Sequence, residues 1–354
     1  MATRVKYYSL TDIHKKCGKE LHEVAKKVIN SEDYVGNTAQ FEEEFAAYTG
    51  AKYCCALNSG SSSLHIALKA LGIKPGDEVI TVSATFQATI AAIKYCGATP
   101  VYLDIEADTL CMDTTKLEQK ITPRTKAILP VHLYGNFCEM GNILTVAHAH
   151  NIPVLEDCAQ ATGTEWKGQH AGTFGNIGCF SFYPGKGLGA LGDAGCIITN
   201  DKHYYDIACS LRSGGVDSSV RLCYNYRMSN LQGEFLRVKL KHLDWVIAEK
   251  QKIANKYRKF LKDYIYMDPH VQHSYHIYPI LTKNRDKIIT SLANTVELKA
   301  HYPTPCHRLP HLSVATTLPI TEKWAKHTLS LPIYPGVDTN KVIEALNDYT
   351  MSFL

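Results

Sequence analysis

The stretch that sets the fold covers residues 179–195 and reads CFSFYPGKGLGALGDAG. Its first five residues form an apolar run typical of a buried strand, which ends at Pro184. A loop with five glycines and a single basic residue, Lys186, follows that strand. Glycine lets the backbone come close to a ligand. A lone lysine in such a loop therefore indicates an amine that is held for chemistry.

The composition is that of an ordinary globular protein, with 354 residues, 45% hydrophobic and 20% charged. This length allows a large core and a second, smaller unit. The net charge is +4 without a basic run, so we expect no nucleic acid and no membrane as partners. No apolar stretch reaches the roughly 18 residues of a membrane span, and the first residues lack a secretion signal. We expect a cytoplasmic protein.

The cysteines indicate reduced thiols. There are twelve, without a CxxC pair, and most lie inside apolar runs. Buried thiols are therefore favoured over disulfides. No Cys/His spacing is typical of zinc, so we expect no metal.

After two N-terminal helices, short apolar strands alternate with helices. The first helix is expected over residues 13–30, and the second ends at Gly50. The expected strands cover residues 53–57, 78–82, 99–103, 127–131, 153–156, 178–183 and 195–199. The expected helices cover residues 62–71, 84–95, 113–120, 140–150 and 204–210. This alternation predicts an α/β fold with a mostly parallel central sheet covered by helices. Ligands bind such sheets beyond the carboxyl ends of the strands.

The alternation stops after residue 230. A long amphipathic helix is expected over residues 231–262, then a strand over 276–281 and helices over 287–292 and 341–349. We predict a large domain of residues 1–244 and a smaller C-terminal α+β domain of residues 245–354.

A serine-rich segment follows the strand at residues 53–57. Residues 58–63 read NSGSSS and open a helix, so free amides, the helix dipole and hydroxyls favour an anion near Gly60 and Ser61. The same segment would also serve as a plain helix N-cap. Ser181, on the strand before Lys186, either adds a hydroxyl to this anion site or is an ordinary strand residue.

Two further strand ends carry side chains that suit an aromatic, cationic ring. Asp157 ends a buried strand, where a carboxylate is costly unless it meets a cation or caps a helix. Gln160 follows three residues later. Phe86 opens a helix after the strand at residues 78–82 and is placed to stack on a ring, although a lone Phe is more often core.

These sites match the three handles of pyridoxal 5'-phosphate: its aldehyde, its phosphate and its pyridine nitrogen. Lys186 is the candidate Schiff-base lysine. A nucleotide loop is the rival interpretation. G-x-x-x-x-G-K-[ST] fails because Phe180 and Gly187 occupy two of its fixed positions, and the glycines do not match G-x-G-x-x-G.

Motifs along nearly the whole chain resemble the DegT/DnrJ/EryC1/StrS sugar aminotransferases. They are NSGSSSLHIAL (58–68), GDEVITVSATFQATIAAI (76–93), PVYLDI (100–105), LPVHLYGN (129–136), the run 155–201, YNYRMSNLQGEFLRVKLKHLD (224–244), HYPTPCH (301–307) and LSLPIYP (329–335). The resemblance implies a fold-type I pyridoxal phosphate transferase and a homodimer with active sites shared between subunits.

The resemblance also implies roles for single residues. Lys186 falls on the Schiff-base lysine, Asp157 on the partner of the ring nitrogen, and Gln160 beside the ring hydroxyl. Phe86 falls on the stacking aromatic. Gly60, Ser61 and Ser181 fall on the phosphate site, and Asn225 on the asparagine that reaches the neighbouring subunit's phosphate. Sugar contacts are expected from four residues: Tyr34, Asn37, His307 and Tyr334.

The implied reaction moves an amino group from L-glutamate to a nucleotide-linked keto sugar, with C4 of dTDP-4-dehydro-6-deoxyglucose as the expected acceptor. A C3 keto sugar, a GDP- or UDP-linked sugar and an inosose are alternatives, and a pyridoxal phosphate-binding scaffold without turnover is a remote one. One departure from the family concerns the neighbours of the lysine. Relatives carry Thr and Asn where this chain has Gly185 and Gly187, so we expect the cofactor and the partner chain to fix the loop.

Overall fold

A computed structural model describes residues 4–213, 223–261 and 270–347 of the chain. Its centre is a sheet whose first part has the strand order β1 (Tyr53–Leu57), β9 (Gly195–Thr199), β8 (Ile177–Ser181) and β5 (Leu155–Asp157). The second part has the order β3 (Thr99–Leu103), β2 (Glu78–Val82) and β4 (Thr125–Ile128). Parallel bridges from Ile128 to Val154 and from Val131 to Asp157 join the two parts.

The sheet is mostly parallel, as the sequence predicts. Only β9 runs against its neighbours, because it pairs antiparallel with both β1 and β8. The strands expected over residues 53–57, 78–82, 99–103 and 195–199 have those bounds in the structure. The other three are shifted or shortened by a few residues, since apolar loop residues extend the pattern that a sequence shows.

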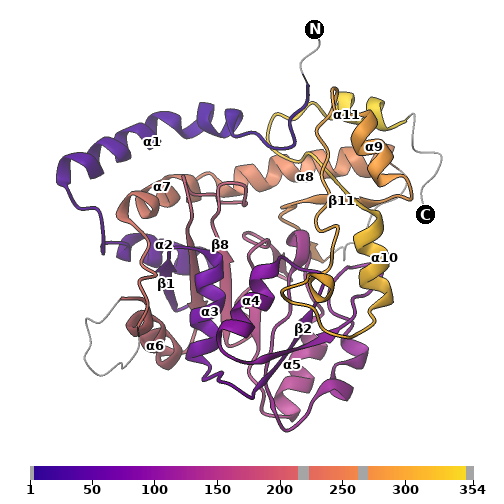
Figure 1. The fold of residues 1–354 in the computed structure, drawn as a ribbon. Helices are drawn as coiled ribbons and strands as arrows, with labels where there is room; N and C mark the ends of the chain where they lie inside the picture. The colour runs from indigo at the N-terminus through magenta and orange to yellow at the C-terminus, as the bar shows by residue number, and fades with distance from the viewer. Residues whose placement is uncertain (1–3, 214–222, 262–269, 348–354) are drawn as a thin grey trace.

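Two helices lie on opposite faces of the sheet at β8. The Phe45 ring of α2 (Ala39–Thr49) packs edge-on against Phe180 and Phe182, at centroid distances of 5.2 and 5.1 Å. Successive strand residues point to opposite faces, so Ser181 points the other way, toward α3 (Gly60–Ala70). α4 (Gln87–Tyr95) lies beside α3 (Figure 1).

Two helix predictions are wrong in detail. Residues 113–120 form two 3₁₀ turns, η1 (Thr114–Lys116) and η2 (Glu118–Lys120), in place of an α-helix. The long helix over 231–262 is two helices, α7 (Asn230–Leu240) and α8 (Leu243–Phe260). The break lets α7 pack along α1 (Thr11–Ser31) while α8 extends toward the C-terminal elements (Figure 1).

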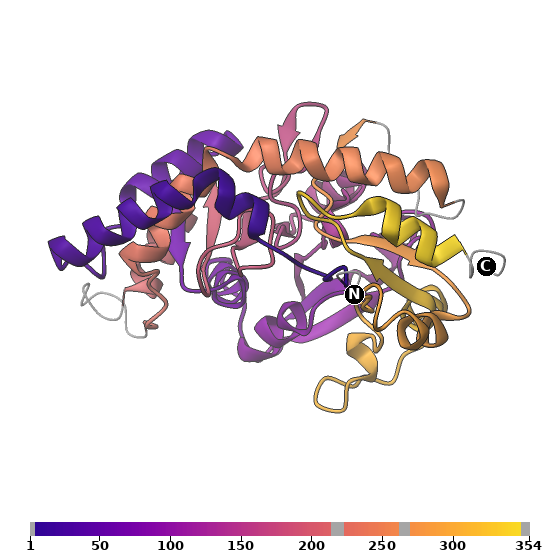
Figure 2. The same cartoon turned by 90° about the horizontal axis from the view of Figure 1, so that it is seen from above.

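The C-terminal elements gather around the far end of α8 (Figures 1 and 2). They are β11 (Tyr278–Leu281), α9 (Arg285–Ser291), α10 (Pro319–His327), β12 (Thr328–Leu331) and α11 (Thr339–Asn347). A second hydrophobic cluster joins them to Val5, whose amide and carbonyl bond Thr295 and Glu297. α8 contributes to both clusters, with Ile247 in the first and Ile253 in the second. The domain boundary near residue 245 stays a prediction.

The smaller elements complete the chain. They are η3 (Leu133–Gly135), α5 (Met140–Ala149), β6 (Glu165–Trp166), β7 (Gln169–His170), α6 (Lys202–Arg212), β10 (Val271–Gln272) and η4 (Cys306–Arg308). All twelve cysteines are free thiols. Among the helices of the described residues, none combines the length and the apolar character needed to span a membrane.

Candidate active site

A cavity of about 700 Å³ opens at the carboxyl ends of the central strands. Asp157 at the end of β5 and Ser181 at the end of β8 line it, together with Lys186. Tyr8 from the N-terminal segment and Tyr302 from the C-terminal region close it from the other side. Its volume is in the range of small-molecule sites, and its place is the one that α/β sheets use for ligands.

The lysine loop is held from within the chain. Its own backbone closes it through Lys186 N to Tyr183 O at 2.7 Å and Ala190 N to Phe182 O at 2.7 Å. The Tyr8 hydroxyl donates to the carbonyl of Pro184, and the Lys239 amine donates to the carbonyl of Gly189. Two distant segments of the chain therefore anchor this loop, and the sequence interpretation did not include them.

The glycines beside Lys186 are not required by space or by backbone conformation. A Cβ at Gly185 would lie 3.6 Å from the Tyr183 ring, and one at Gly187 would lie 3.5 Å from a backbone oxygen, which are ordinary contacts. Gly189 differs, because its φ is +57° and a Cβ there would lie 2.6 Å from the carbonyl oxygen of Pro184. The loop would therefore accept side chains at positions 185 and 187.

The amine of Lys186 is buried and has a lowered pKa. Burial lowers the pKa of Lys186 to about 8, and the charge of Asp157 partly offsets this shift. About a tenth of the amine is therefore neutral at pH 7, far more than at the ordinary lysine pKa, and a general base or nucleophile needs this neutral form.

Asp157 is a buried carboxylate that forms no ion pair with any residue the structure describes. It is 4% exposed. Its Oδ2 accepts a hydrogen bond from the Thr89 hydroxyl at 2.8 Å, and its Oδ1 accepts one from the amide of Ala159 at 3.1 Å. Burial raises the pKa of Asp157, while these hydrogen bonds and the charge of Lys186 lower it. The carboxylate is therefore fixed in direction and suits a cationic N–H group from a ligand.

The N-terminus of α3 offers an anion site on the same side of the sheet. Ser59 caps the helix by accepting from the amide of Ser62 at 3.1 Å, so the amides of Gly60 and Ser61 stand ahead of the first intrahelical bonds. A Cβ at Gly60 would lie 2.6 Å from the Cβ of Ser181. Glycine thus lets the helix end reach β8, where the hydroxyls of Ser61 and Ser181 line one cavity.

Phe86 and Gln160 complete the lining. Phe86 is 49% exposed although it follows a fully buried strand, so it belongs to the cavity and not to the core. The Gln160 carbonyl accepts from the amide of Tyr134 at 2.7 Å, and its amide donates to the Tyr302 hydroxyl at 3.0 Å. An anion site, a buried acid, a lysine and an exposed aromatic face meet in one cavity, and this set fits pyridoxal phosphate.

The other predicted residues lie in different places. Tyr334 lines the cavity. Tyr34 and Asn37 lie outside the cavity lining, and Asn225 is exposed. His307 is 1% exposed, with Nδ1 2.7 Å from Ser83 Oγ and Nε2 3.1 Å from Glu322 Oε1, so both of its nitrogens are engaged. The roles of these five residues toward substrate or partner stay predictions.

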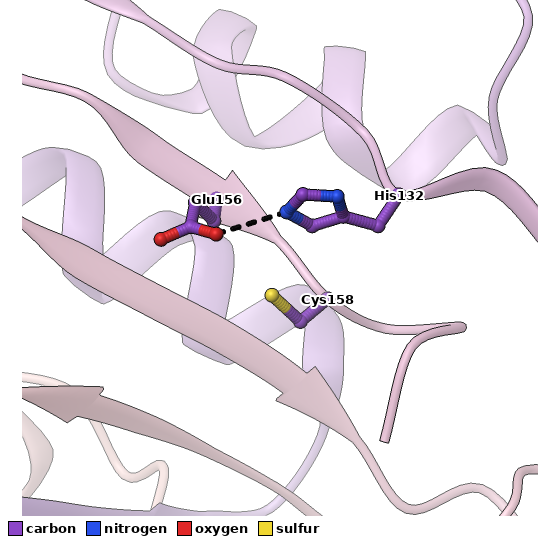
Figure 3. Close-up of side chains that lie close together, drawn as sticks. All are labelled: His132, Glu156 and Cys158. Atoms are coloured by element: carbon purple, nitrogen blue, oxygen red, sulfur yellow. Dashed lines mark hydrogen bonds and ion pairs between the residues drawn. The ribbon is translucent and has the colours of Figure 1, made fainter. Parts of the chain in front are cut away.

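A second buried group lies on the opposite face of β5 (Figure 3). His132, Glu156 and Cys158 are fully buried and close enough to suggest a metal site. However, the Glu156 carboxylate already accepts four hydrogen bonds: one from His132 Nε2 and three from the amides of Gly172, Phe174 and Gly175. A carboxylate has about four lone-pair sites, so none remains for an ion. This cluster is a structural hydrogen-bond network.

Several residues of the site escaped the sequence interpretation. Thr89 and Tyr302 hold Asp157 and Gln160, and Lys250 and His276 add polar groups to the wall. Thr89 lies in a helical pattern one turn after Phe86, and this spacing could have indicated it. Tyr302 comes from a segment more than 140 residues after Gln160, and no local pattern joins the two.

The chain matches known proteins along most of its length. The family model of the DegT/DnrJ/EryC1/StrS aminotransferase family matches residues 14–347. A dTDP-3-amino-3,4,6-trideoxy-alpha-D-glucose transaminase from Micromonospora megalomicea subsp. nigra is 37% identical over 87% of this chain and 88% of the relative. DesV from S. venezuelae, solved in complex with a ketimine intermediate, superposes with a TM-score of 0.95 at 33% identity over 99% of both chains.

A further solved structure carries a form of the cofactor. NtdA from Bacillus subtilis, with bound cofactor PMP, superposes with a TM-score of 0.87 at 29% identity, over 95% of this chain and 82% of that one. The fold-type I architecture and the resemblance in motifs are thereby confirmed. This chain belongs to the DegT/DnrJ/EryC1/StrS aminotransferase family, whose members depend on pyridoxal phosphate.

Proposed function

We propose that this chain moves an amino group from L-glutamate to a nucleotide-linked keto sugar, as a pyridoxal phosphate-dependent homodimer. The observation that carries the proposal is the meeting of Lys186 and Asp157 in one cavity. Each is buried with a shifted pKa, and each lacks a protein ion-pair partner in contact among the described residues. Perturbed groups in a cavity are typical of catalysis.

Different residues of the cavity would bind different parts of the cofactor. Lys186 would hold the cofactor covalently, and Asp157 would accept the N–H of its ring, with Thr89 and the Ala159 amide fixing the carboxylate. The amides and hydroxyls of Gly60, Ser61 and Ser181 would hold its phosphate. Phe86 would cover one face of the ring, and Gln160 would lie beside the ring hydroxyl. Asn225 would reach the phosphate in the neighbouring subunit.

Proton transfer falls to Lys186. When bound, pyridoxal phosphate supplies an electron sink for the carbanion at the reacting carbon. Once the donor's amino group has replaced the amine of Lys186 on the cofactor, the freed amine would take the proton from the reacting carbon of the donor and give it to the cofactor carbon that carried the aldehyde. A pKa of about 8 for Lys186 suits this role near neutral pH. Tyr8 and Lys239 keep the loop, and therefore the amine, in place.

The acceptor is proposed as a dTDP-linked keto sugar. C4 of dTDP-4-dehydro-6-deoxyglucose is the position expected from the sequence. A C3 acceptor is the second candidate, because the Micromonospora relative is named for a 3-amino product. Tyr334, which lines the cavity, is the candidate sugar contact within this chain. Tyr34, Asn37 and His307 stay candidates outside that lining.

One assay tests the donor and the acceptor together. The holoprotein is incubated with L-glutamate and a panel of dTDP-, GDP- and UDP-linked keto sugars. Products are identified by mass spectrometry and the aminated carbon by NMR. We expect 2-oxoglutarate and one amino sugar in equal amounts. If L-glutamate gives no 2-oxoglutarate and no sugar is aminated, the proposal fails and a scaffold without turnover takes its place.

A further inference from the structure

Lys250 is a buried cation in the cavity wall without a partner. It lies in the middle of α8, is 6% exposed and lines the cavity. Within the part of the chain that the structure describes, its amine forms no hydrogen bond and no ion pair. The nearby lysines differ, since Lys239 donates to the carbonyl of Gly189 and Lys299 lies 3.8 Å from Glu297.

Another positively charged side chain acts on Lys250 within the described part of the chain. Burial, together with the charge of Lys239, lowers the pKa of Lys250 to about 8. His276 lines the same wall, and its Nδ1 is buried without a partner in the described residues. Burial lowers the pKa of His276, and the charges of Lys186 and Lys250 lower it further. Lys250, His276 and Lys186 all line one cavity.

We propose that Lys250 binds a carboxylate of the amino-acid donor, with His276 as a second contact; this inference rests on the proposed aminotransferase function. A buried amine without a partner is costly unless an anion meets it. An amino acid carries its α-carboxylate one bond from the carbon that reacts at Lys186. The diphosphate of a sugar nucleotide lies on the far side of the sugar ring. Because Lys250 and Lys186 line one cavity, the α-carboxylate is the anion that the donor brings into that cavity. Neutral His276 would donate to the second oxygen through Nε2, because its Nδ1 is buried away from the cavity.

Glutarate, which is glutamate without its amino group, tests this site without turnover. Calorimetry measures its affinity for the holoprotein. We expect Lys250→Met to weaken glutarate binding at least about 30-fold, because it removes one partner of a buried charged contact. Lys250→Gln should do the same, and Lys250→Arg should stay within about threefold. Lys252→Met is the control, since Lys252 is an exposed lysine on the same helix that pairs with Glu249 at 2.7 Å.

A parallel titration with dTDP separates the two anions. We expect its affinity to be unchanged in Lys250→Met, and in turnover the KM for L-glutamate should rise while the KM for the keto sugar does not. Unchanged glutarate binding in both neutral variants would overturn the proposal, and a loss of dTDP binding alone would reassign Lys250 to the diphosphate. If no keto sugar is aminated but glutarate binding still depends on Lys250, only the proposed function fails. Melting temperature and the visible spectrum of the bound cofactor verify folding.

Discussion

The two faces of β5 carry neighbouring carboxylates with opposite surroundings. Glu156 points to a closed network in which four donors occupy its oxygens. Asp157, the next residue, points into the cavity, and within the described part of the chain it accepts only from Thr89 and the Ala159 amide. The protein therefore occupies all acceptor sites of the Glu156 carboxylate, while the Asp157 carboxylate has acceptor sites left for a ligand. The two residues are similar in type and in burial. The number of hydrogen bonds that each carboxylate accepts is what distinguishes a structural carboxylate from a candidate ligand-binding one.

The strongest test of the cavity side is Lys186→Ala. We expect kcat to fall roughly 10⁴-fold or more, because the acid–base group and the covalent anchor are lost together. The visible band of the protein-bound cofactor should also disappear. Amine production is measured by mass spectrometry, and the melting temperature of the apoprotein serves as the folding control. Retained activity in a folded variant would remove Lys186 from the mechanism.

The Asp157→Asn variant tests the ligand-facing carboxylate, and its effects can be compared with those of the Glu156→Gln variant. We expect activity to fall about 10²–10³-fold, since a neutral amide cannot stabilise a protonated ring nitrogen. The unfolding free energy of the apoprotein should change by less than about 1 kcal/mol, because the Thr89 hydroxyl can reverse its hydrogen bond and accept from the new amide. Activity and urea denaturation are measured on the same preparation. A large stability loss with intact activity would make Asp157 a structural residue.

For Glu156→Gln we expect a large loss of stability and a small loss of activity, the reverse of Asp157→Asn. The new amide group must face at least one of four donors, so we expect a loss of about 2–3 kcal/mol in unfolding free energy. The activity of the folded variant should fall far less than that of Asp157→Asn. Urea denaturation of the apoprotein gives the stability. The unfolding free energy of the wild type is also measured with added zinc. If zinc raises it clearly, the cluster of His132, Glu156 and Cys158 is a metal site and the prediction is wrong.

The smallest effect concerns the pH dependence of glutarate binding. The anion favours the protonated amine of Lys250, whose pKa is about 8 in the free protein. Affinity should therefore be full below pH 8 and fall about tenfold per pH unit above it. Lys239, Lys186, His273 and His276 also face this region. Burial lowers the pKa of His273 to about 3 and that of His276 well below its usual value, so both stay neutral here.

Lys250→Arg isolates the contribution of Lys250 to that slope. Arginine keeps its charge throughout this range, so the pH dependence should flatten in the variant. Calorimetry from pH 7 to 9.5 gives both curves. The same slope in wild type and variant would assign the titration to Lys239 or Lys186 and contradict the site at Lys250.

The sequence was informative where a residue's role follows from its own strand. Lys186, Asp157, Ser181 and Phe86 each follow an apolar run, and the carboxyl ends of parallel strands meet at one edge. Four strands have the predicted bounds, because short buried runs between polar turns leave little choice of register.

The sequence did not indicate residues that reach the cavity or the lysine loop only through tertiary contacts. In the sequence, Lys250 is one of several polar residues in an amphipathic helix. It is a buried cation because α8 lines the cavity at this residue. Tyr8 and Lys239 carry no pattern that would place them on the lysine loop. The break between α7 and α8 has a similar origin, since helical periodicity continues across residues 241 and 242.

The pairing of Val5 with residues 295 and 297 sets an order of events during synthesis. The segment that carries Tyr8 to the lysine loop precedes the central sheet in the chain, yet the residues that pair with Val5 follow about 290 residues later. Tyr302 and Tyr334, which close the cavity, follow later still. Contacts of such separation in the chain form late. The central sheet can thus assemble on the nascent chain, while the cavity is completed only after Tyr302 and Tyr334 have been added.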